Sequence, residues 1–276
     1  MTYLRLRQIC LVAHELAPVV DALCQVLGLQ VCHRDPQVAR FGLHNALMRM
    51  GSNFIEVVAP LPGSVGEGTA ATRHLARRGG DSGYMVILDC DDVAPWRAHM
   101  AQIGVREAAL LHVQGAYTGL QLHPRDSGGA LLEINHTPGG AALDGAYWPA
   151  GPHWQDAPDC SIGTRLSALA LYAAQPEALA ARWAQILQRP LLQQSGNLTI
   201  ALDAAVNLNF LPLDSAALAA NPRLEGLSQI SLCSTGAQGQ SASVFAGVAA
   251  RAKVWGAAVD DVQRAVKLGG VWWQIV

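Results

Sequence analysis

Residues 4–13 read LRLRQICLVA, and this stretch opens an order of elements that closes at residues 53–58 with NFIEVV. The same order opens again at residues 83–88 with GYMVIL and closes at residues 130–135 with ALLEIN. A repeat of this kind predicts two equivalent supersecondary units that pack against each other.

Each repeat closes on a strand that carries a glutamate. Gln8 and Glu56 are 56 − 8 = 48 positions apart, and Met85 and Glu133 are 133 − 85 = 48 positions apart. Because equivalent units place equivalent positions together, we expect Gln8, Glu56 and Glu133 to converge on one pocket.

The first half of the chain follows the pattern βαβββ twice. Apolar alternation and helical spacing, with turn residues between them, set the elements. In the first repeat they are a strand at 4–13, a helix from Leu16 to Leu27 ended by Gly28, and strands near 30–34, 40–50 and 52–59. In the second they are a strand at 83–90, a helix at 93–103, and strands near 105–113, 117–123 and 129–135.

The second half repeats the same order after residues 137–162, which are rich in Gly, Pro, Trp and Asp and suit an ordered linker. The expected elements are a strand at 166–173, a helix at 176–187, strands near 190–194, 197–203 and 206–213, a strand at 227–234, a helix at 243–255 and a closing strand at 270–276. The fourth unit is the least regular.

Composition narrows the class of protein. About half of the 276 residues are hydrophobic, 14% are charged and the formal net charge is −2, so we expect a well-buried globule that binds neither nucleic acid nor an anionic membrane. No spanning helix or signal peptide is visible at the N-terminus. The six cysteines form no C-x-x-C pair, and four of them, Cys10, Cys24, Cys90 and Cys233, lie in or beside apolar segments as expected of reduced core thiols. This favours a cytoplasmic protein.

Three short pieces carry a resemblance to a known family. They are VLGL at 26–29, FIE at 54–56, and HPRDSGG at 123–129 ahead of the Glu133 strand. In order and spacing the chain resembles the vicinal oxygen chelate superfamily, the glyoxalase-like proteins. The 123–133 segment is similar to the closing hairpin of methylmalonyl-CoA epimerases.

The resemblance implies an α+β fold in which paired βαβββ units form curved mixed sheets. It covers residues 4–136 well and the second half by its order of elements. We therefore expect a glyoxalase-like domain with the candidate site at 1–139, a linker at 140–162, and a degenerate glyoxalase-like domain at 163–276.

The resemblance also implies a site. Metal-dependent members take ligands in the chain order Gln or His, Glu, His, Glu, which Gln8, Glu56 and Glu133 match at three places. Met85 stands where the second histidine is expected, and its thioether is a soft ligand that suits hard cations poorly. By resemblance, Gln8, Glu56 and Glu133 would hold a divalent ion of unspecified identity beside Met85, and Glu133 would be the catalytic base.

Two functions stay open on this sequence. The first is an enzyme that removes a proton beside the carbonyl of a small molecule, a lyase, isomerase or epimerase with a weakly held divalent cation. The second is a metal-free protein that binds an apolar small molecule in the same pocket. The small molecule is the expected partner, and a homodimer is left open beside a monomer.

Each candidate residue also has a structural interpretation. Glu56 is suited to an ion pair with a nearby arginine, Gln8 to a satisfied core amide and Met85 to a core filler. In the second half the equivalent positions offer neither a carboxylate nor a histidine: Ala168, Asn209, Gln229 and Gln274. We therefore expect that half to hold no metal and to pack against or roof the first.

Overall fold

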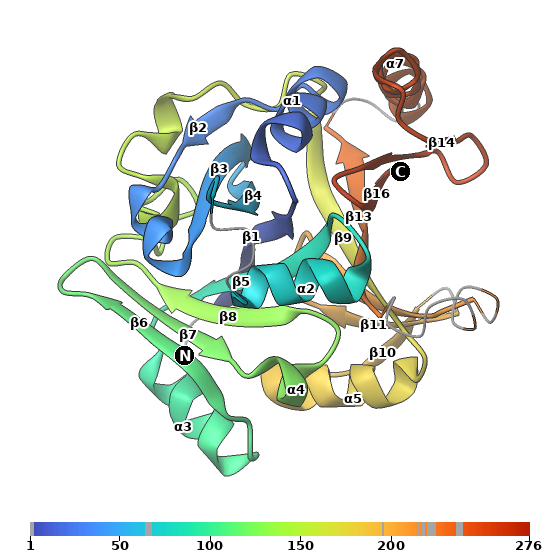
Figure 1. Cartoon of the computed structure of the whole chain (residues 1–276). Coiled ribbons are helices and arrows are strands. Elements are labelled where there is room, and N and C mark those ends of the chain that lie inside the picture. The colour runs from blue at the N-terminus through green and yellow to red at the C-terminus, as the bar shows by residue number, and fades with distance from the viewer. Residues whose placement is uncertain are drawn as a thin grey trace. The chain divides into compact units, whose positions relative to one another are not determined.

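The computed structural model describes residues 3–63, 68–194, 196–214, 216, 219, 225–235 and 240–276 (Figure 1). The first half contributes β1 (Leu4–Val12), β2 (Val31–His33), β3 (Leu43–Met50), β4 (Asn53–Pro60), β5 (Ser82–Cys90), β6 (Glu107–Val113), β7 (Tyr117–Leu122) and β8 (Leu131–His136). The second half contributes β9 (Thr164–Ala173), β10 (Leu192–Gln194), β11 (Asn197–Ala201), β12 (Asn207–Pro212), β13 (Gly226–Ser234), β14 (Val259–Asp260), β15 (Ala265–Leu268) and β16 (Val271–Ile275).

These strands form two eight-stranded mixed sheets of the same topology. Their orders are β2-β3-β4-β1-β5-β8-β7-β6 and β10-β11-β12-β9-β13-β16-β15-β14. The helices are α1 (Leu16–Leu27), η1 (Pro36–Phe41), α2 (Ala70–Arg78), α3 (Ala94–Gln102), α4 (Pro124–Ser127), η2 (Trp148–Ala150), η3 (Trp154–Asp156), α5 (Pro176–Leu187) and α7 (Gln240–Trp255). The α+β class with paired βαβββ units is confirmed.

Local sequence accounts for elements of the first half of the chain. Helix α1 buries the face formed by its regularly spaced apolar residues, and Gly28 ends it with a left-handed φ of 66° that suits glycine. Strand β5 is buried along its whole length and pairs with β8 in parallel. A parallel strand buried on both faces reads as a continuous apolar run, as residues 83–88 do.

Two segments differ from the sequence prediction. The sequence predicts no helix between the strand near 52–59 and the strand at 83–90, and the structure has α2 there, with the Thr69 side chain accepting a hydrogen bond from the Thr72 amide at 3.2 Å. Only Ala71 and Leu75 of α2 are buried, so it has too few apolar positions to show a helical period. Residues 64–67 lie outside the described part of the chain. Between the strands predicted near 117–123 and 129–135, where the sequence predicts no helix, the structure has the short helix α4.

The chain divides into two compact units that interleave its halves. The first unit is Met1–Ile9, Tyr84–Trp148 and Leu169–Leu227. Within it α5 packs on α4, since the Trp183 indole donates to the Ser127 carbonyl at 3.1 Å and Arg182 donates to the Asp126 carbonyl at 2.9 Å. A repeat from each half therefore packs together in this unit.

The second unit is Cys10–Gly83, Pro149–Ala168 and Ser228–Val276. Within it Arg251 of α7 donates to the carbonyl of Val26 in α1 at 2.9 Å. Arg49 of β3 donates to the carbonyls of Gln155 and Ala157, both at 3.0 Å, so this part of the expected linker is ordered. The domain boundaries at 139 and 162 stay a prediction.

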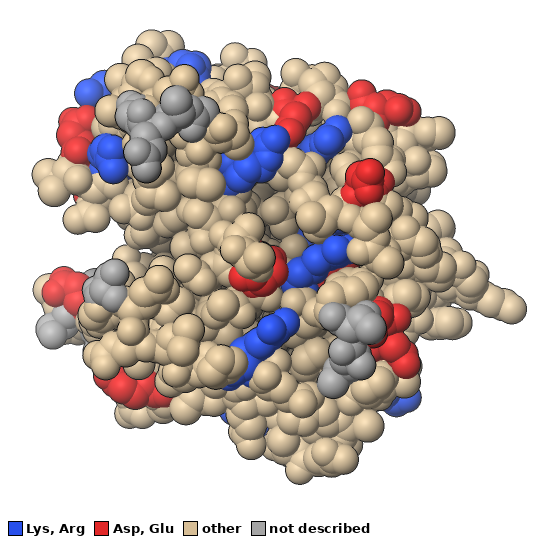
Figure 2. All heavy atoms as spheres, turned by 180° about the vertical axis from the view of Figure 1, so that it is seen from behind, with Lys and Arg blue, Asp and Glu red and all other residues tan. Residues whose placement is uncertain are grey.

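The described surface fits the modest net charge. Figure 2 shows acidic and basic side chains interspersed on the face that it presents. Among the helices of the described residues, none has the length and apolar character needed to cross a bilayer.

Candidate functional site

Glu133 lies in the first unit on β8, which pairs with β5 on one side and with β7 on the other. It stands opposite Ile87 of β5 and opposite Gln121 of β7. Paired residues on neighbouring strands share a face, and every second residue returns to it. The Glu133 side chain is therefore flanked on both sides by the sheet and is only 4% exposed.

Three protein donors hold the Glu133 carboxylate. The Tyr117 hydroxyl and the Asn135 amide, the latter at 3.2 Å, donate to Oε1. The Gln121 amide donates to Oε2 at 2.9 Å. A buried carboxylate is tolerated when such donors replace water, and their directions fix the orientation of both oxygens.

Gly119 makes the tyrosine contact possible. It lies on β7 between Tyr117 and Gln121, on the face of the sheet to which Glu133 of β8 points. A Cβ at this position would lie 2.7 Å from the Tyr117 hydroxyl oxygen. Without a side chain at 119, the ring of Tyr117 folds back across the strand to Glu133. This glycine is used for close approach.

The tyrosine stays a neutral donor. Burial, followed by the charge of Glu133, raises the pKa of Tyr117 well above its ordinary value. The phenol therefore keeps its proton over the physiological range and can hold the carboxylate through it.

Gln8 joins the same unit through a second tyrosine. The Tyr147 hydroxyl donates to Gln8 Oε1 at 2.9 Å, across 139 positions of sequence. Burial raises the pKa of Tyr147 well above its ordinary value, with a hydrogen bond to Asn135 opposing the shift. Asn135 thus connects the surroundings of Glu133 with those of Gln8. We name Gln8, Tyr117, Gln121, Glu133, Asn135 and Tyr147 the Glu133 cluster.

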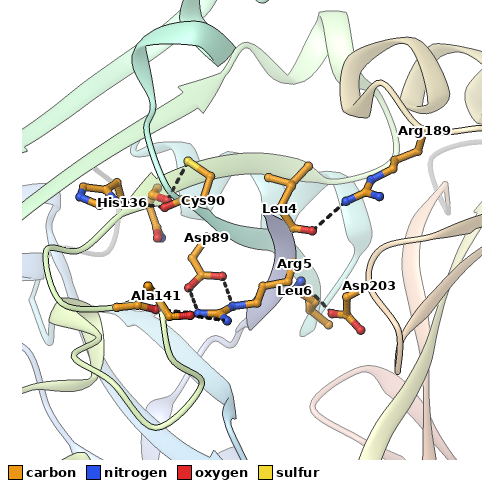
Figure 3. Close-up of polar contacts among 11 residues, drawn as sticks. Leu4, Arg5, Leu6, Asp89, Cys90, His136, Ala141, Arg189 and Asp203 are labelled. Carbon is orange, nitrogen blue, oxygen red and sulfur yellow. Dashed lines mark hydrogen bonds and ion pairs between the residues drawn. The ribbon is translucent and has the colours of Figure 1, made fainter. Parts of the chain in front are cut away.

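Two arginines of β1 border this cluster. Arg7 is fully buried, and its guanidinium lies 5.1 Å from the centre of the Tyr147 ring. Burial, opposed by the charge of Asp89, lowers the pKa of Arg7. Arg5 forms a two-pronged ion pair with Asp89, both bonds at 2.9 Å (Figure 3). Burial raises the pKa of Asp89, and the Arg5 hydrogen bond opposes that shift.

The other predicted site residues have different surroundings. Met85 is buried on β5, two residues before the partner of Glu133 and therefore on the same face. Glu56 belongs to the second unit, where the Asn45 amide donates to its Oε1 at 2.7 Å. The structure brings Gln8, Met85 and Glu133 into one unit, and the convergence of Glu56 with them stays a prediction.

A divalent ion needs several protein side chains with free donor atoms at one place. No group of three or more His, Cys, Asp or Glu side chains that could hold a metal occurs among the described residues. A carboxylate offers about four lone-pair positions, and protein donors use three of them at Glu133. Gln8 Oε1, a second predicted ligand, already accepts from the Tyr147 hydroxyl. These side chains fit a carboxylate and an amide held by the protein through hydrogen bonds better than they fit the ligands of a divalent ion.

One surface hollow, of about 420 Å³, belongs to the second unit. Its lining carries no charged side chain: Cys24, Gln25, Gly28, Leu29, Gln30, Val31 and Ser161. Burial raises the pKa of the Cys24 thiol, which makes it a poor nucleophile. This hollow therefore offers no acid or base.

A family model described as a glyoxalase-like domain matches residues 9–187, which is 187 − 8 = 179 of the 276 residues. The chain belongs to the glyoxalase-like family. The predicted membership in the vicinal oxygen chelate superfamily is thereby confirmed. No curated protein matches this glyoxalase-like chain significantly.

Solved structures share the fold along nearly all of the glyoxalase-like chain. A mutant of 4-hydroxymandelate synthase from Streptomyces coelicolor has a TM-score of 0.69 at 13% identity, covering 99% of this chain and 92% of the other. A hypothetical protein from Staphylococcus aureus has 0.65 at 8% identity, covering 99% and 98%. The Mn(II)-bound glyoxalase from Novosphingobium aromaticivorans has 0.59 at 12%, covering 98% and 80%. At these identities the likeness shows the fold alone.

Sequence reasoning missed most of the residues around Glu133. Alternation along β7 and β8 was a usable signal, because Tyr117, Gly119 and Gln121 lie at every second position and Asn135 follows Glu133 by two. Tyr147 had no such signal, since it lies in a stretch without a period. Its role depends on a contact between distant parts of the glyoxalase-like chain.

Proposed function

We propose that this protein is an enzyme that removes a proton beside the carbonyl group of a small molecule, with Glu133 as the general base. The observation that supports this is the carboxylate held by Tyr117, Gln121 and Asn135 inside a glyoxalase-like fold. A base of fixed orientation abstracts a proton efficiently when the substrate is positioned against it.

The Asn135 side-chain oxygen is evidence that the cluster binds a polar molecule. Asn135 Oδ1 is fully buried and has no hydrogen-bond partner within the described residues, while the amide nitrogen of the same side chain is used. Buried acceptors are normally satisfied. A hydroxyl or N–H group on the substrate would satisfy this one, next to the base.

The remaining residues supply positive and polar surroundings. When Glu133 takes the proton, negative charge develops on the carbonyl oxygen of the substrate, and fixed donors stabilise it. We assign this role to the Arg7 guanidinium and the Gln8 amide, which both contact Tyr147 in the same unit. The proposed reaction uses these side chains and no metal.

Exchange of the proton for deuterium tests the proposal without knowledge of the final product. The protein is incubated in D₂O with hydroxyacetone, with 2-oxo acids and with α-substituted thioesters, and the loss of the proton beside the carbonyl is followed by NMR. We expect catalysed exchange on one of these classes, and a loss of about 10²-fold or more in Glu133→Gln.

Glu107→Gln is the matched control. Glu107 lies in the same unit, and its ion pair with Arg97 is exposed. Its replacement should leave exchange unchanged. Exchange that persists in Glu133→Gln, with folding confirmed by circular dichroism, would remove Glu133 as the base.

A metal-free binding protein is the second candidate. It is favoured by Met85, which is an apolar neighbour, and by the hydrogen bonds that already engage both oxygens of Glu133. Saturable binding of a probe molecule by the wild-type chain, with no exchange and with equal affinity in Glu133→Gln, would decide for this candidate.

A further inference from the structure

The Glu133 cluster is closed from solvent in this structure except at Gln121, which is half-buried. Glu133 is 4% exposed, Gln8 is 2%, Tyr147 is 1% and Asn135 is 0%. A substrate reaches the Glu133 carboxylate and the Asn135 amide only if a covering segment moves. Within the first unit, the segment that inserts a side chain into the cluster is residues 137–148, through Tyr147.

Residues 137–148 form a loop that carries its own hydrogen bonds. Its ends are joined by the Trp148 amide, which donates to the Thr137 hydroxyl at 3.2 Å. Inside it the amides of Gly140, Gly145 and Ala146 donate to carbonyls of the same loop at 2.9–3.1 Å. Compact loops with joined ends keep their shape when they move, and many are functional.

Most of this loop faces solvent, with Leu143 51% exposed, whereas Tyr147 is buried. Tyr147 reaches inward to Gln8, and its ring lies against Arg7. An exposed loop with one inserted aromatic side chain has little buried surface to lose when it lifts.

Arg5 holds the loop from outside the cluster. Its guanidinium donates to the Gly140 carbonyl at 2.7 Å and to the Ala141 carbonyl at 3.0 Å, while Asp89 fixes the same group (Figure 3). Figure 3 also shows β1 anchored next to Arg5, since the Leu6 amide donates to Asp203 at 3.2 Å. The cation thus connects a fixed strand with the loop.

We infer that residues 137–148 are a lid over the Glu133 cluster, that Tyr147 fills the space a substrate enters, and that Arg5 holds the lid shut. The importance of the lid for turnover rests on the proposed function, but the gated access does not. The cluster can bind a substrate only when Tyr147 has moved out of it with the lid.

A thiol in place of the base measures access without any turnover. In Glu133→Cys, labelling by a small thiol reagent is followed peptide by peptide with mass spectrometry. When opening is brief and reversible, the labelling rate follows the open fraction. Native Cys90 is fully buried in the same unit and reports general loosening.

Asp89→Asn and Arg5→Met/Asp89→Asn, both made in Glu133→Cys, form a matched pair. Because both variants carry Asp89→Asn, neither leaves a buried Asp89 carboxylate without the Arg5 guanidinium. The two variants differ only in whether Arg5 is present to hold residues 137–148. Losing two charge-assisted hydrogen bonds should speed labelling at position 133 by about tenfold or more, with Cys90 unchanged. Tyr147→Phe in Glu133→Cys removes the bond to Gln8 and should give a smaller increase.

Equal labelling at position 133 in the matched pair would overturn the lid, and so would a parallel rise at Cys90. If labelling at position 133 is faster without Arg5 but the wild-type chain catalyses no proton exchange, the lid is supported and the proposed function is refuted. If the wild-type chain catalyses proton exchange but labelling at position 133 does not depend on Arg5, the proposed function is supported and the lid is refuted.

Discussion

Replacing Gly119 with alanine tests whether the Tyr117 contact with Glu133 depends on an absent side chain. The new Cβ would lie 2.7 Å from the Tyr117 hydroxyl oxygen and 2.9 Å from its Cε1. Real Cβ atoms do not approach so closely, so the ring must move. Overpacking of a buried site costs about 1–3 kcal/mol, and displacing the hydroxyl removes a hydrogen bond to a charged group worth about 1.5–3 kcal/mol.

These costs overlap, because one movement of the ring causes both. We expect Gly119→Ala to lower the free energy of unfolding by about 2 kcal/mol. Urea unfolding followed by tryptophan fluorescence measures the change, with the wild-type chain as reference.

A double-mutant cycle isolates the cause. In Tyr117→Ala the ring is absent, and with it the three atoms that would lie nearest to a Cβ at position 119. Alanine restricts the unfolded chain more than glycine does, so Gly119→Ala should be neutral or stabilising by about 0.5 kcal/mol in that background. Destabilisation of equal size in both backgrounds would refute the steric argument, since it would place the cost in the backbone at 119.

The remaining predictions concern pH, metal and the ordered linker. Burial lowers the pKa of His74 from 6.5 to about 4, so the folded chain favours the neutral ring. The contribution of His74 to stability is therefore complete above pH 6.5 and is lost as the pH drops from 6.5 towards 4. The urea midpoint should fall less across this window in His74→Gln than in the wild-type chain. Mn²⁺ at about 1 mM should leave the melting temperature unchanged; an increase that Glu133→Gln abolishes would contradict the assigned donor set. Arg49→Met removes two bonds to carbonyls of residues 149–160 and should speed amide hydrogen exchange there, whereas Arg40→Met, whose guanidinium lies over Phe41, should not.

Local patterns predicted the elements that have a strong period. The apolar spacing of α1 with Gly28 after it, and the unbroken apolar run of β5, appear in the structure close to their expected bounds. Helix α2 shows the limit of this reasoning. It has two buried residues and a polar sequence, so its position depends on a capping threonine and on tertiary packing more than on a pattern.

The candidate site stays a prediction. The repeat spacing singled out Gln8, Glu56, Met85 and Glu133, of which the structure places Gln8, Met85 and Glu133 in one unit and Glu56 in the other. The hydrogen-bond donors to Glu133 were not predicted, although Gln121 and Asn135 follow from strand alternation once the register of β7 against β8 is known. Register depends on pairing between strands, and a single strand does not contain it.

By itself the sequence determined the four βαβββ repeats and the pair of strands that carry glutamates, because hydrophobic period and turn chemistry are local properties of the chain. Only the tertiary structure decided that Tyr117 folds over Gly119 to Glu133 and that Tyr147 reaches Gln8 across 139 positions. Such contacts arise when distant segments are packed together, and their energies belong to pairs of residues that no local pattern connects.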